Sequence, residues 1–417
     1  MQKGICAIDF GTSNTVMAYV NNGEVALARL EQNNNVIPST VFYGVEGETA
    51  FGREAIELFK EGEEGRFMRS LKRILGTRLM GQGTSVNGRQ KKYEAIIADF
   101  LRNTKKGVER TMGTEFDRVV MGRPVFFQDN DEETDQRAQD ELERIAKSIG
   151  FKEVSFQFEP IAASFAHEQE LQKEALALVV DIGGGTSDFT VMRLSKEKSK
   201  QMDRRGDVLA NTGTRIGGND FDKTFCLSSF MQNFGFGQTY GDKNLPLPNL
   251  LFYTMSEWSE IHTLYNRQVM EQAKGFQREV KQKEPFGRFV ELLEEESGHK
   301  VLDHVEQAKI ALSDVAQTDV LFDFLSHPFE AAVTREELNN RVTEHVDKII
   351  TCSQKCVATA GITPADLDLI ILTGGTTENP YLRRRVIETY PNATLSENGK
   401  LASVATGLGF DAMRRYA

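Results

Sequence analysis

One short design occurs twice in this chain of 417 residues, at residues 7–14 and again at residues 180–188. The first copy reads AIDFGTSN and the second reads VDIGGGTSD. In each copy an apolar segment with an aspartate near its end leads into a Gly/Thr/Ser turn, and a second apolar segment follows. β-branched residues on both sides of such a turn are typical of a strand, a tight turn and a second strand. Because both copies open comparable mixed β/α halves, we predict two related α/β domains that face each other.

The two turns are suited to binding anions. Their glycines leave backbone N–H groups open, and a tight turn points several of these groups into one concave site. The aspartate before each turn, Asp9 or Asp181, can hold a hydrated Mg²⁺ against a bound phosphate. The candidate phosphate-binding residues are Gly11, Thr12, Ser13, Asn14, Gly183, Gly184, Gly185 and Thr186. Two such turns, one from each half of the chain, can grip a polyphosphate between them.

The common helix-opening nucleotide loops fit these glycines less well. A Walker A loop needs Gly-Lys-Ser/Thr at the start of a helix, and a dinucleotide fingerprint needs Gly-x-Gly-x-x-Gly there. Strand-type residues follow both turns, and neither turn contains a lysine. A pair of ordinary Gly-rich hairpins remains the alternative. A third glycine turn, at residues 373–377, suits either the approach of a base or ribose or a simple strand-to-helix connection.

The overall charge limits the partners. Lys plus Arg number 50 and Asp plus Glu number 61, so the net charge is −11. Such a surface repels nucleic acid and anionic lipid, and we expect neither nucleic acid nor a membrane as a partner. A small anion can still bind, because salt screens distant charge beyond about 10 Å. The four cysteines do not suit a disulfide framework and the N-terminus does not resemble a signal sequence, so we expect a cytoplasmic protein.

Periodicity predicts the remaining elements coarsely. Residues 53–78 are expected to be mostly helical, and residues 221–312 mainly helical with a Gly/Pro-rich interruption. Residues 335–360 are expected to form a long helix, and residues 367–372 a buried strand.

The three glycine turns, in this order and at this separation, resemble those of the actin, sugar kinase and heat-shock ATPase superfamily. Within it, the chain is similar to the nucleotide-binding domain of the seventy-kilodalton heat-shock chaperones of the DnaK type. Residues 226–300 fit this family least well and are closer to the shorter YegD-like proteins, which lack the peptide-binding domain. The further segments that carry the resemblance are LKRILG at 71–76, FEPIAAS at 158–164, RIGGNDFD at 215–222 and EQAKIALS at 306–313.

The resemblance implies a two-lobed actin-like ATPase fold, built from duplicated ribonuclease-H-like domains that each carry an inserted subdomain. Lobe I would cover residues 1–173 with an insertion at about 37–114. Lobe II would cover residues 174–417 with an insertion at about 219–335. The family's peptide-binding half would follow residue 415, and because the chain ends at residue 417 we do not expect peptide-clamp chaperoning.

The resemblance also implies cofactors and residue roles. ATP or ADP would bind with Mg²⁺, and Asp9 and Asp181 would orient the waters of a metal that bridges the β- and γ-phosphates. Lys72 would position the attacking water and stabilise charge on the γ-phosphoryl group, with Glu159 and Asp188 completing the polar shell. The expected catalytic set is therefore Asp9, Lys72, Glu159, Asp181 and Thr186. The other expected nucleotide-binding residues are Asp188, Gly217, Gly218, Glu306, Lys309, Ser313, Gly374, Gly375 and Thr376.

Pattern alone leaves several of these roles open, and the chain departs from the family at two positions. Lys72 could equally be a solvated lysine and Glu159 a helix-entry carboxylate, while the polar face at residues 306–313 could be a solvated stripe. The two arginines that flank adenine in DnaK-type proteins correspond here to Ile310 and Glu378. Losing two guanidinium planes removes stacking worth about 0.5–2 kcal/mol each, so we expect weaker nucleotide binding than in the family.

We expect a Mg²⁺-dependent, slow ATPase that acts as a chaperone-like conformational switch. A protein client or co-chaperone is compatible with this function, and the sequence does not identify one. Two other classes stay open: an actin-like protein that polymerises with nucleotide, and a small-molecule kinase of the same superfamily.

Overall fold

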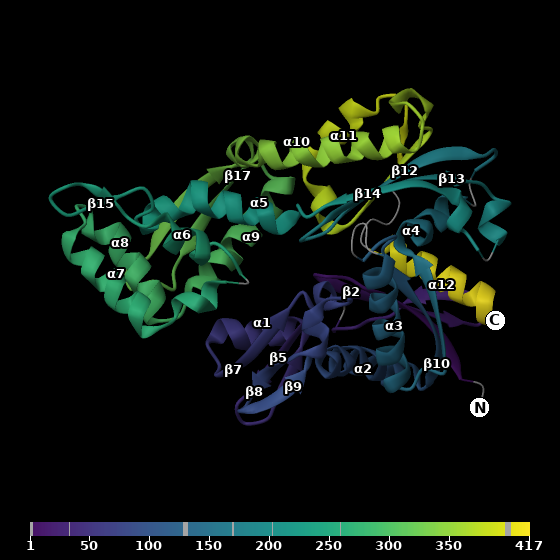
Figure 1. Ribbon diagram of the computed structural model, residues 1–417, viewed down its shortest axis with the longest axis horizontal. Helices are drawn as coiled ribbons and strands as arrows, with labels where there is room; N and C mark the ends of the chain where they lie inside the picture. Colours follow the sequence, from purple (N-terminus) through teal and green to yellow (C-terminus); the bar gives the residue numbers. More distant parts are fainter. Residues whose placement is uncertain are drawn as a thin grey trace. The chain divides into compact units, whose positions relative to one another are not determined.

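The structure of the chain is a computed structural model that describes residues 3–32, 34–127, 132–168, 171–201, 203–258, 260–396 and 402–417. The chain divides into two compact units (Figure 1). The first unit contains Met1–Arg215, Ile350–Thr377 and Val386–Ala417. The second contains Ile216–Ile349 and Glu378–Arg385.

The first unit contains a sheet built around the N-terminal strand β1 (Gly4–Phe10). The strand order is β11-β10-β1-β2-β3, and a short strand β4 also pairs with β2. β2 pairs antiparallel with both β1 and β3, whereas β10 and β11 continue the sheet in parallel with β1. The bounds of these partners are β2 Asn14–Asn21, β3 Glu24–Leu27, β4 Val36–Pro38, β10 Phe116–Arg123 and β11 Glu153–Phe158.

A second sheet in the same unit repeats this arrangement around strand β12 (Ala175–Ile182). Its order is β14-β13-β12-β19-β20. Again three antiparallel strands, β12, β13 and β14, are extended by two parallel ones, β19 and β20. The bounds are β13 Ser187–Leu194, β14 Val208–Thr214, β19 Leu369–Thr373 and β20 Thr394–Ser396. The two sheets therefore share strand order and strand direction, as the repeated motif predicts.

Helices cover these sheets in the first unit. α4 (Glu159–Glu168) packs closely against α12 (Ser403–Tyr416), because Gly407 has no side chain to hold the two backbones apart. α12 also packs on β1, β2, β3 and β10, and a buried apolar cluster joins residues of β1, α4, β12 and α12. The remaining helices with residues in this unit are α1 Gly52–Glu61, α2 Tyr93–Met112, α3 Glu132–Ser148, α10 Arg335–Thr359, which begins in the second unit, and α11 Pro380–Thr389, of which only the end lies in it.

Residues 53–78 differ from the helical expectation. Only the part up to Glu61 is α-helical, in α1. Strand β7 (Gly65–Arg69) then pairs with β5 (Thr40–Gly44), and short 3₁₀ turns follow at Leu71–Ile74 and Arg78–Gly81. The prediction was wrong here because the pairing partner of β7 lies outside the window in which helical spacing was read. The neighbouring strands are β6 Thr49–Phe51, β8 Gly83–Val86 and β9 Arg89–Lys92.

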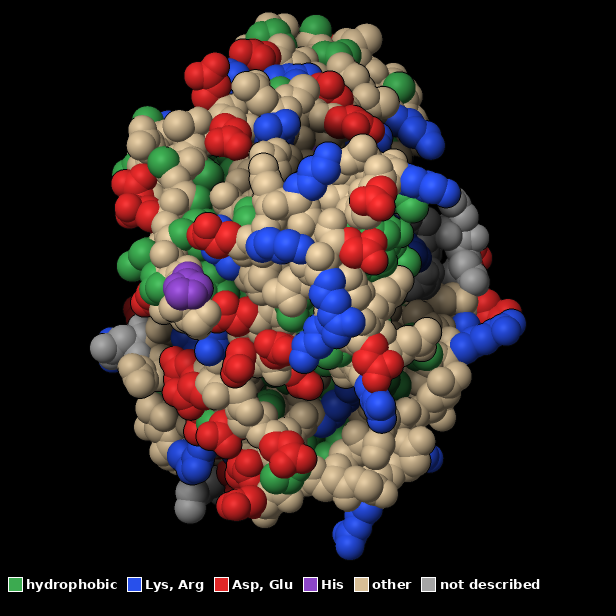
Figure 2. Space-filling view, turned by 90° about the vertical axis from the view of Figure 1, so that its left-hand side faces the viewer, with side chains coloured by type: hydrophobic (Ala, Val, Ile, Leu, Met, Phe, Trp, Pro, Cys, Tyr) green, Lys and Arg blue, Asp and Glu red, His purple; other side chains and the backbone are tan. Residues whose placement is uncertain are grey.

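The second unit is mainly helical around an aromatic core. Phe230, Phe234 and Phe329 pack against Phe322, with ring centroids 4.7 to 5.9 Å from that ring. On the face drawn in Figure 2, acidic and basic side chains are intermingled. The bounds are α5 Gly218–Phe225, β15 Thr239–Tyr240, β16 Leu245–Pro246, α6 Asn249–Met255, α7 Arg267–Glu279, α8 Lys283–Glu294, α9 Gly298–Asp314, β17 Gln317–Phe322 and β18 Phe329–Thr334.

The predicted lobe boundary between residues 173 and 174 stays a prediction. Both sheets belong to the first compact unit, so the division into units does not follow that boundary. In the part of the chain that the structure describes, no helix is both long and apolar enough to cross a lipid bilayer.

Candidate functional site

The two predicted turns are closed by the same backbone hydrogen bond. In the turn between β1 and β2, the Gly11 N–H donates to the Asn14 carbonyl at 2.9 Å. In the turn between β12 and β13, the Gly183 N–H donates to the Thr186 carbonyl at 3.0 Å. A Cβ atom on Gly11 would lie 2.2 Å from the Asn14 carbonyl oxygen, so this position of the first turn requires glycine. Each turn closes an antiparallel hairpin, and backbone N–H groups in a tight turn can bind an anion.

Four carboxylates act on one another beside these turns. Asp9 and Asp181 each occupy the second-last position of their strand, and Asp188 pairs with Asp181 across β12 and β13. Burial raises the pKa of Asp9 to about 7, and the negative charge of Glu159 adds to the rise while Lys72 opposes it. Burial likewise raises the pKa of Asp181, followed by the charges of Glu159, Asp188 and Asp9. Burial and mutual repulsion therefore both disfavour the ionised forms of Asp9 and Asp181.

One buried lysine faces this cluster. Lys72 lies in the 3₁₀ turn Leu71–Ile74, and its Nζ donates to Oε1 of Glu159, the first residue of α4, at 2.6 Å. Their side chains are 10% and 11% exposed, so Lys72 is not a solvated surface lysine. Burial acts to lower the pKa of Lys72, but the charges of Glu159, Asp9 and Asp181 raise it overall. The ammonium group therefore stays charged among the carboxylates.

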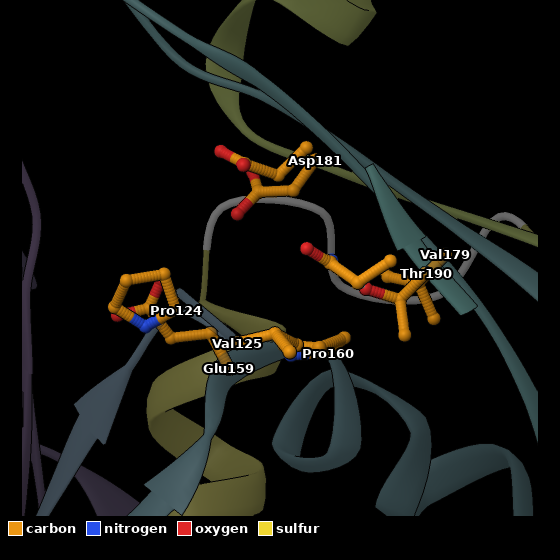
Figure 3. Close-up of a pocket in the computed structure, with 9 residues that line it drawn as sticks. Pro124, Val125, Glu159, Pro160, Val179, Asp181 and Thr190 are labelled. Atoms are coloured by element: carbon orange, nitrogen blue, oxygen red, sulfur yellow. The ribbon is translucent and has the colours of Figure 1, made fainter. Parts of the chain in front are cut away.

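A small pocket of about 20 Å³ opens beside Glu159, Asp181 and Asp188 within the first unit. Figure 3 shows Val179, Asp181 and Thr190 on one side of the pocket and Glu159 on the other. The full lining is Pro124, Val125, Glu159, Pro160, Val179, Asp181, Asp188, Thr190 and Asn211. This volume has room for about one water molecule.

Several of the residues that line the pocket were not predicted from the sequence. Some of them could have been found from the alternation of side chains along a strand. On β13, Thr190 is two residues from Asp188 and therefore shares its face of the sheet. Asn211 lies opposite Thr190 on β14 and donates to its hydroxyl at 2.8 Å. Pro124 and Val125 could not be found in this way, because they follow the end of β10.

The third glycine turn packs directly on the second. Gly374 has a φ of +83°, and a Cβ atom there would lie 2.3 Å from the Ile182 carbonyl oxygen and 2.8 Å from Oδ1 of Asp181. The Thr376 hydroxyl donates to the Gly183 carbonyl at 2.8 Å. Gly375 begins a 3₁₀ turn that ends at Glu378. The backbone of the third turn therefore packs against Ile182 and lies beside Asp181.

The other expected nucleotide-binding residues belong to the second unit. Gly217 and Gly218 lie at the start of α5. Lys309 on α9 donates to Oδ2 of Asp222 at 2.7 Å, a partner that the sequence did not predict. Ser313 and Glu306 on α9 are half-buried, as is Lys309, so this face is not a fully solvated stripe. Ile310 is 51% exposed on the same helix.

The first unit fits a magnesium ion bound through water. Among the described residues, no group of three or more His, Cys, Asp or Glu side chains is placed to hold a metal ion directly. Burial and then the charges of neighbouring carboxylates raise the pKa values of Asp9 and Asp181, and a nearby cation would favour their ionised forms. Their carboxylate oxygens are also the hard donors that Mg²⁺ prefers, and Mg²⁺ commonly keeps several waters.

Asp9→Asn is expected to raise the melting temperature of the nucleotide-free protein in EDTA at pH 8. The ordinary pKa of this carboxyl is 3.8 and its folded value is about 7, so the folded state binds the proton more tightly. Wild-type stability should therefore fall as pH rises from about 4 to about 7, and the advantage of the variant should grow over this range. Calorimetry at several pH values measures the difference.

Asp203→Asn provides the control for this prediction. Hydrogen bonds from Arg205 lower the pKa of exposed Asp203 to about 2, so its neutralisation should bring no gain at pH 8. An advantage of Asp9→Asn that did not change with pH would contradict the prediction.

Comparison with known proteins adds two findings. The family model described as "Hsp70 protein" matches residues 5–241 and 287–410. The chain is 24% identical to "Chaperone protein HscA homolog" of Actinobacillus pleuropneumoniae serotype 5b, over 97% of this chain and 57% of that protein. It is 25% identical to "Chaperone protein DnaK" of Nitrosopumilus maritimus, over 98% of this chain and 56% of that protein. The chain thus spans a little more than half the length of these curated relatives.

Proposed function

Because the chain belongs to the Hsp70 protein family, which confirms the resemblance and the actin-like α/β fold class, we propose that it binds and slowly hydrolyses ATP with Mg²⁺. The observation that carries this proposal is the buried ion pair of Lys72 and Glu159 beside the matched carboxylates Asp9 and Asp181. Among the described residues, the Lys72 ammonium lies amid Asp9, Glu159 and Asp181, whose charges raise its pKa. A Mg²⁺ ion would compensate part of the carboxylate charge, and it would also bind the phosphate oxygens of the nucleotide.

The proposed chemistry uses this chain's own groups for binding and orientation. The N–H groups of the two glycine turns would hold phosphate oxygens, and Asp9 and Asp181 would orient metal-bound water. The Lys72 ammonium would donate to the γ-phosphoryl group and position the attacking water, while Glu159 keeps Lys72 in place. Bound Mg²⁺ would neutralise charge on the β- and γ-phosphates. Such positioning and charge stabilisation account for most of the catalysis of phosphoryl transfer.

We also propose that nucleotide drives a conformational switch of a chaperone-like protein. The relatives in the comparison carry the word chaperone in their names, which supports a client or co-chaperone as the downstream partner. The turn at Gly374 packs closely on the glycine turn between β12 and β13. This packing supports a coupling between the bound nucleotide and the segment that follows β19.

Ile310→Arg is expected to tighten ADP binding. In DnaK-type proteins an arginine at this position flanks the adenine, and the exposed Ile310 side chain leaves room for a guanidinium plane. Stacking and cation–π attraction of about 0.5–2 kcal/mol correspond to roughly a 2- to 30-fold lower Kd. Titration calorimetry measures the change, and Ile387→Arg, at an exposed isoleucine on α11, should leave the Kd unchanged. A nanomolar ATP dissociation constant in the wild type would contradict the expected weak binding.

The proposed function is tested by ATP turnover of the purified chain with Mg²⁺ and with EDTA. Turnover that requires Mg²⁺ and no second substrate supports the proposal. ATP-dependent pelleting at high concentration would instead favour an actin-like polymer. Turnover that appears only with a sugar or similar acceptor would favour a small-molecule kinase.

A further inference from the structure

The end of strand β10 lies against the pocket of the proposed ATPase. β10 pairs with β1, which carries Asp9, on one side and with β11, which leads into Glu159, on the other. Its last residue, Arg123, lies opposite Phe158, the residue directly before Glu159. The next two residues, Pro124 and Val125, line the pocket together with Glu159. The position of Arg123 therefore affects both the wall of the pocket and the start of α4.

The Arg123 guanidinium group donates hydrogen bonds both to α3 and to the Pro124–Val125 segment that lines the pocket. The residue is 8% exposed. Toward α3, Nη2 donates to Oδ2 of Asp135 and Nη1 donates to Oε1 of Gln139, each at 2.5 Å. Toward the wall of the pocket formed by Pro124 and Val125, Nε donates to the Pro124 carbonyl at 3.1 Å and Nη2 donates to the Val125 carbonyl at 3.2 Å. One guanidinium plane thus joins α3 to the segment that lines the pocket.

Two further contacts complete this arrangement, which we call the Arg123 clamp. Asp135 uses its second oxygen, Oδ1, to accept the Phe127 N–H at 2.7 Å, so it holds the same segment from α3. The guanidinium carbon also lies 5.3 Å from the ring centroid of Phe158 and 5.2 Å from that of Phe127. A lysine cannot reproduce this set of bonds, because its ammonium group is not planar and cannot stack in the same way.

We infer that Arg123 is a positioning residue for ATP hydrolysis, which fixes the Pro124–Val125 wall relative to the Lys72–Glu159 pair. This inference rests on the proposed ATPase function. The bonds of the Arg123 clamp run to α3, to the wall and to Phe158, so Arg123 acts through these groups rather than on the nucleotide itself. Displacements below 1 Å at such a site are enough to change a catalytic rate strongly. Nucleotide affinity, which comes mainly from the glycine turns, should change little.

The test compares Arg123→Lys with Asp135→Asn, which weakens the same clamp from α3 and keeps the arginine. Single-turnover hydrolysis, ATP affinity and melting temperature are measured for each. Both variants should hydrolyse bound ATP about tenfold more slowly with the Kd within about twofold of wild type. The double variant should be little slower than either single one, because both changes release one clamp.

Arg204→Lys is the matched control. Arg204 is a second buried arginine of the first unit, paired with Glu168 and Asp207, and it does not line the pocket. Its substitution should lower the melting temperature and leave the rate of the folded protein unchanged.

Several outcomes would overturn the inference. Unchanged hydrolysis in folded Arg123→Lys and Asp135→Asn would do so while leaving the ATPase in place. The inference would also be overturned if the hydrolysis rate, the ATP affinity and the melting temperature all fell together, because Arg123 would then only stabilise the fold. Failure of both variants to fold would lead to the same conclusion. If only Arg123→Lys fails to fold, the hydrolysis rate of Asp135→Asn tests the inference. A wild-type protein without ATP turnover would overturn the proposed function, and this inference with it.

Discussion

Lys72→Ala is expected to lower ATP turnover by about a hundredfold or more, while the protein still binds nucleotide. The Lys72 ammonium is buried, charged and held at 2.6 Å from Glu159, so it is preorganised to act on charge that develops during phosphoryl transfer. The N–H groups of the two glycine turns remain in the variant, and they supply most of the proposed phosphate contacts. Steady-state turnover and titration calorimetry measure the two quantities separately.

The control for this variant is Lys106→Ala, at an exposed lysine of α2 in the same unit. Its turnover should equal that of the wild type. Lys72→Ala also leaves Glu159 without its partner, so melting temperature must be followed to separate lost catalysis from lost folding. Wild-type turnover in a folded Lys72→Ala protein would refute the proposed role of the lysine.

The features of the fold that could be predicted are those determined by residues close together in the sequence. The repeated turn is one of these, because apolar strands, an aspartate and glycines lie within nine residues of one another at 180–188. The structure gives both copies the same closing hydrogen bond and gives the two sheets the same strand order. The error at β7 has the opposite cause, because its partner β5 lies more than twenty residues earlier in the chain.

The candidate site could be predicted only in part. Its two glycine turns could be predicted from local spacing, but Lys72 and Glu159 are 87 residues apart, and only the family resemblance connected them. Asp222 and Asp135 were missed, although they hold Lys309 and Arg123, because each pair joins elements that no periodic pattern relates. Burial and long-range side-chain partners are set by tertiary packing, and the sequence does not state them locally.

Gly374→Ala is expected to destabilise the protein by more than the ordinary cost of a left-handed residue and to abolish nucleotide binding. The positive φ alone costs roughly 1–2 kcal/mol for a residue with a Cβ atom. The added methyl would also overlap the Ile182 carbonyl oxygen at 2.3 Å and approach Oδ1 of Asp181 at 2.8 Å. The first of these neighbours is backbone, so no side-chain rotation relieves the overlap, and the third turn must move away from the second phosphate turn.

Gly361→Ala separates the cost of the positive φ from the cost of the steric overlap. Gly361 has a φ of +72° in the same unit, but a Cβ atom there meets nothing within 4 Å. This control should show the backbone cost alone and keep wild-type nucleotide affinity. Chemical denaturation of both variants measures the difference in the free energy of unfolding, and calorimetry measures ADP binding. If Gly374→Ala lost no more stability than Gly361→Ala and still bound ADP, the contact between the third turn and the second phosphate turn would not matter for the site. A larger loss in Gly374→Ala would show that the tight packing beside Asp181 is what requires glycine.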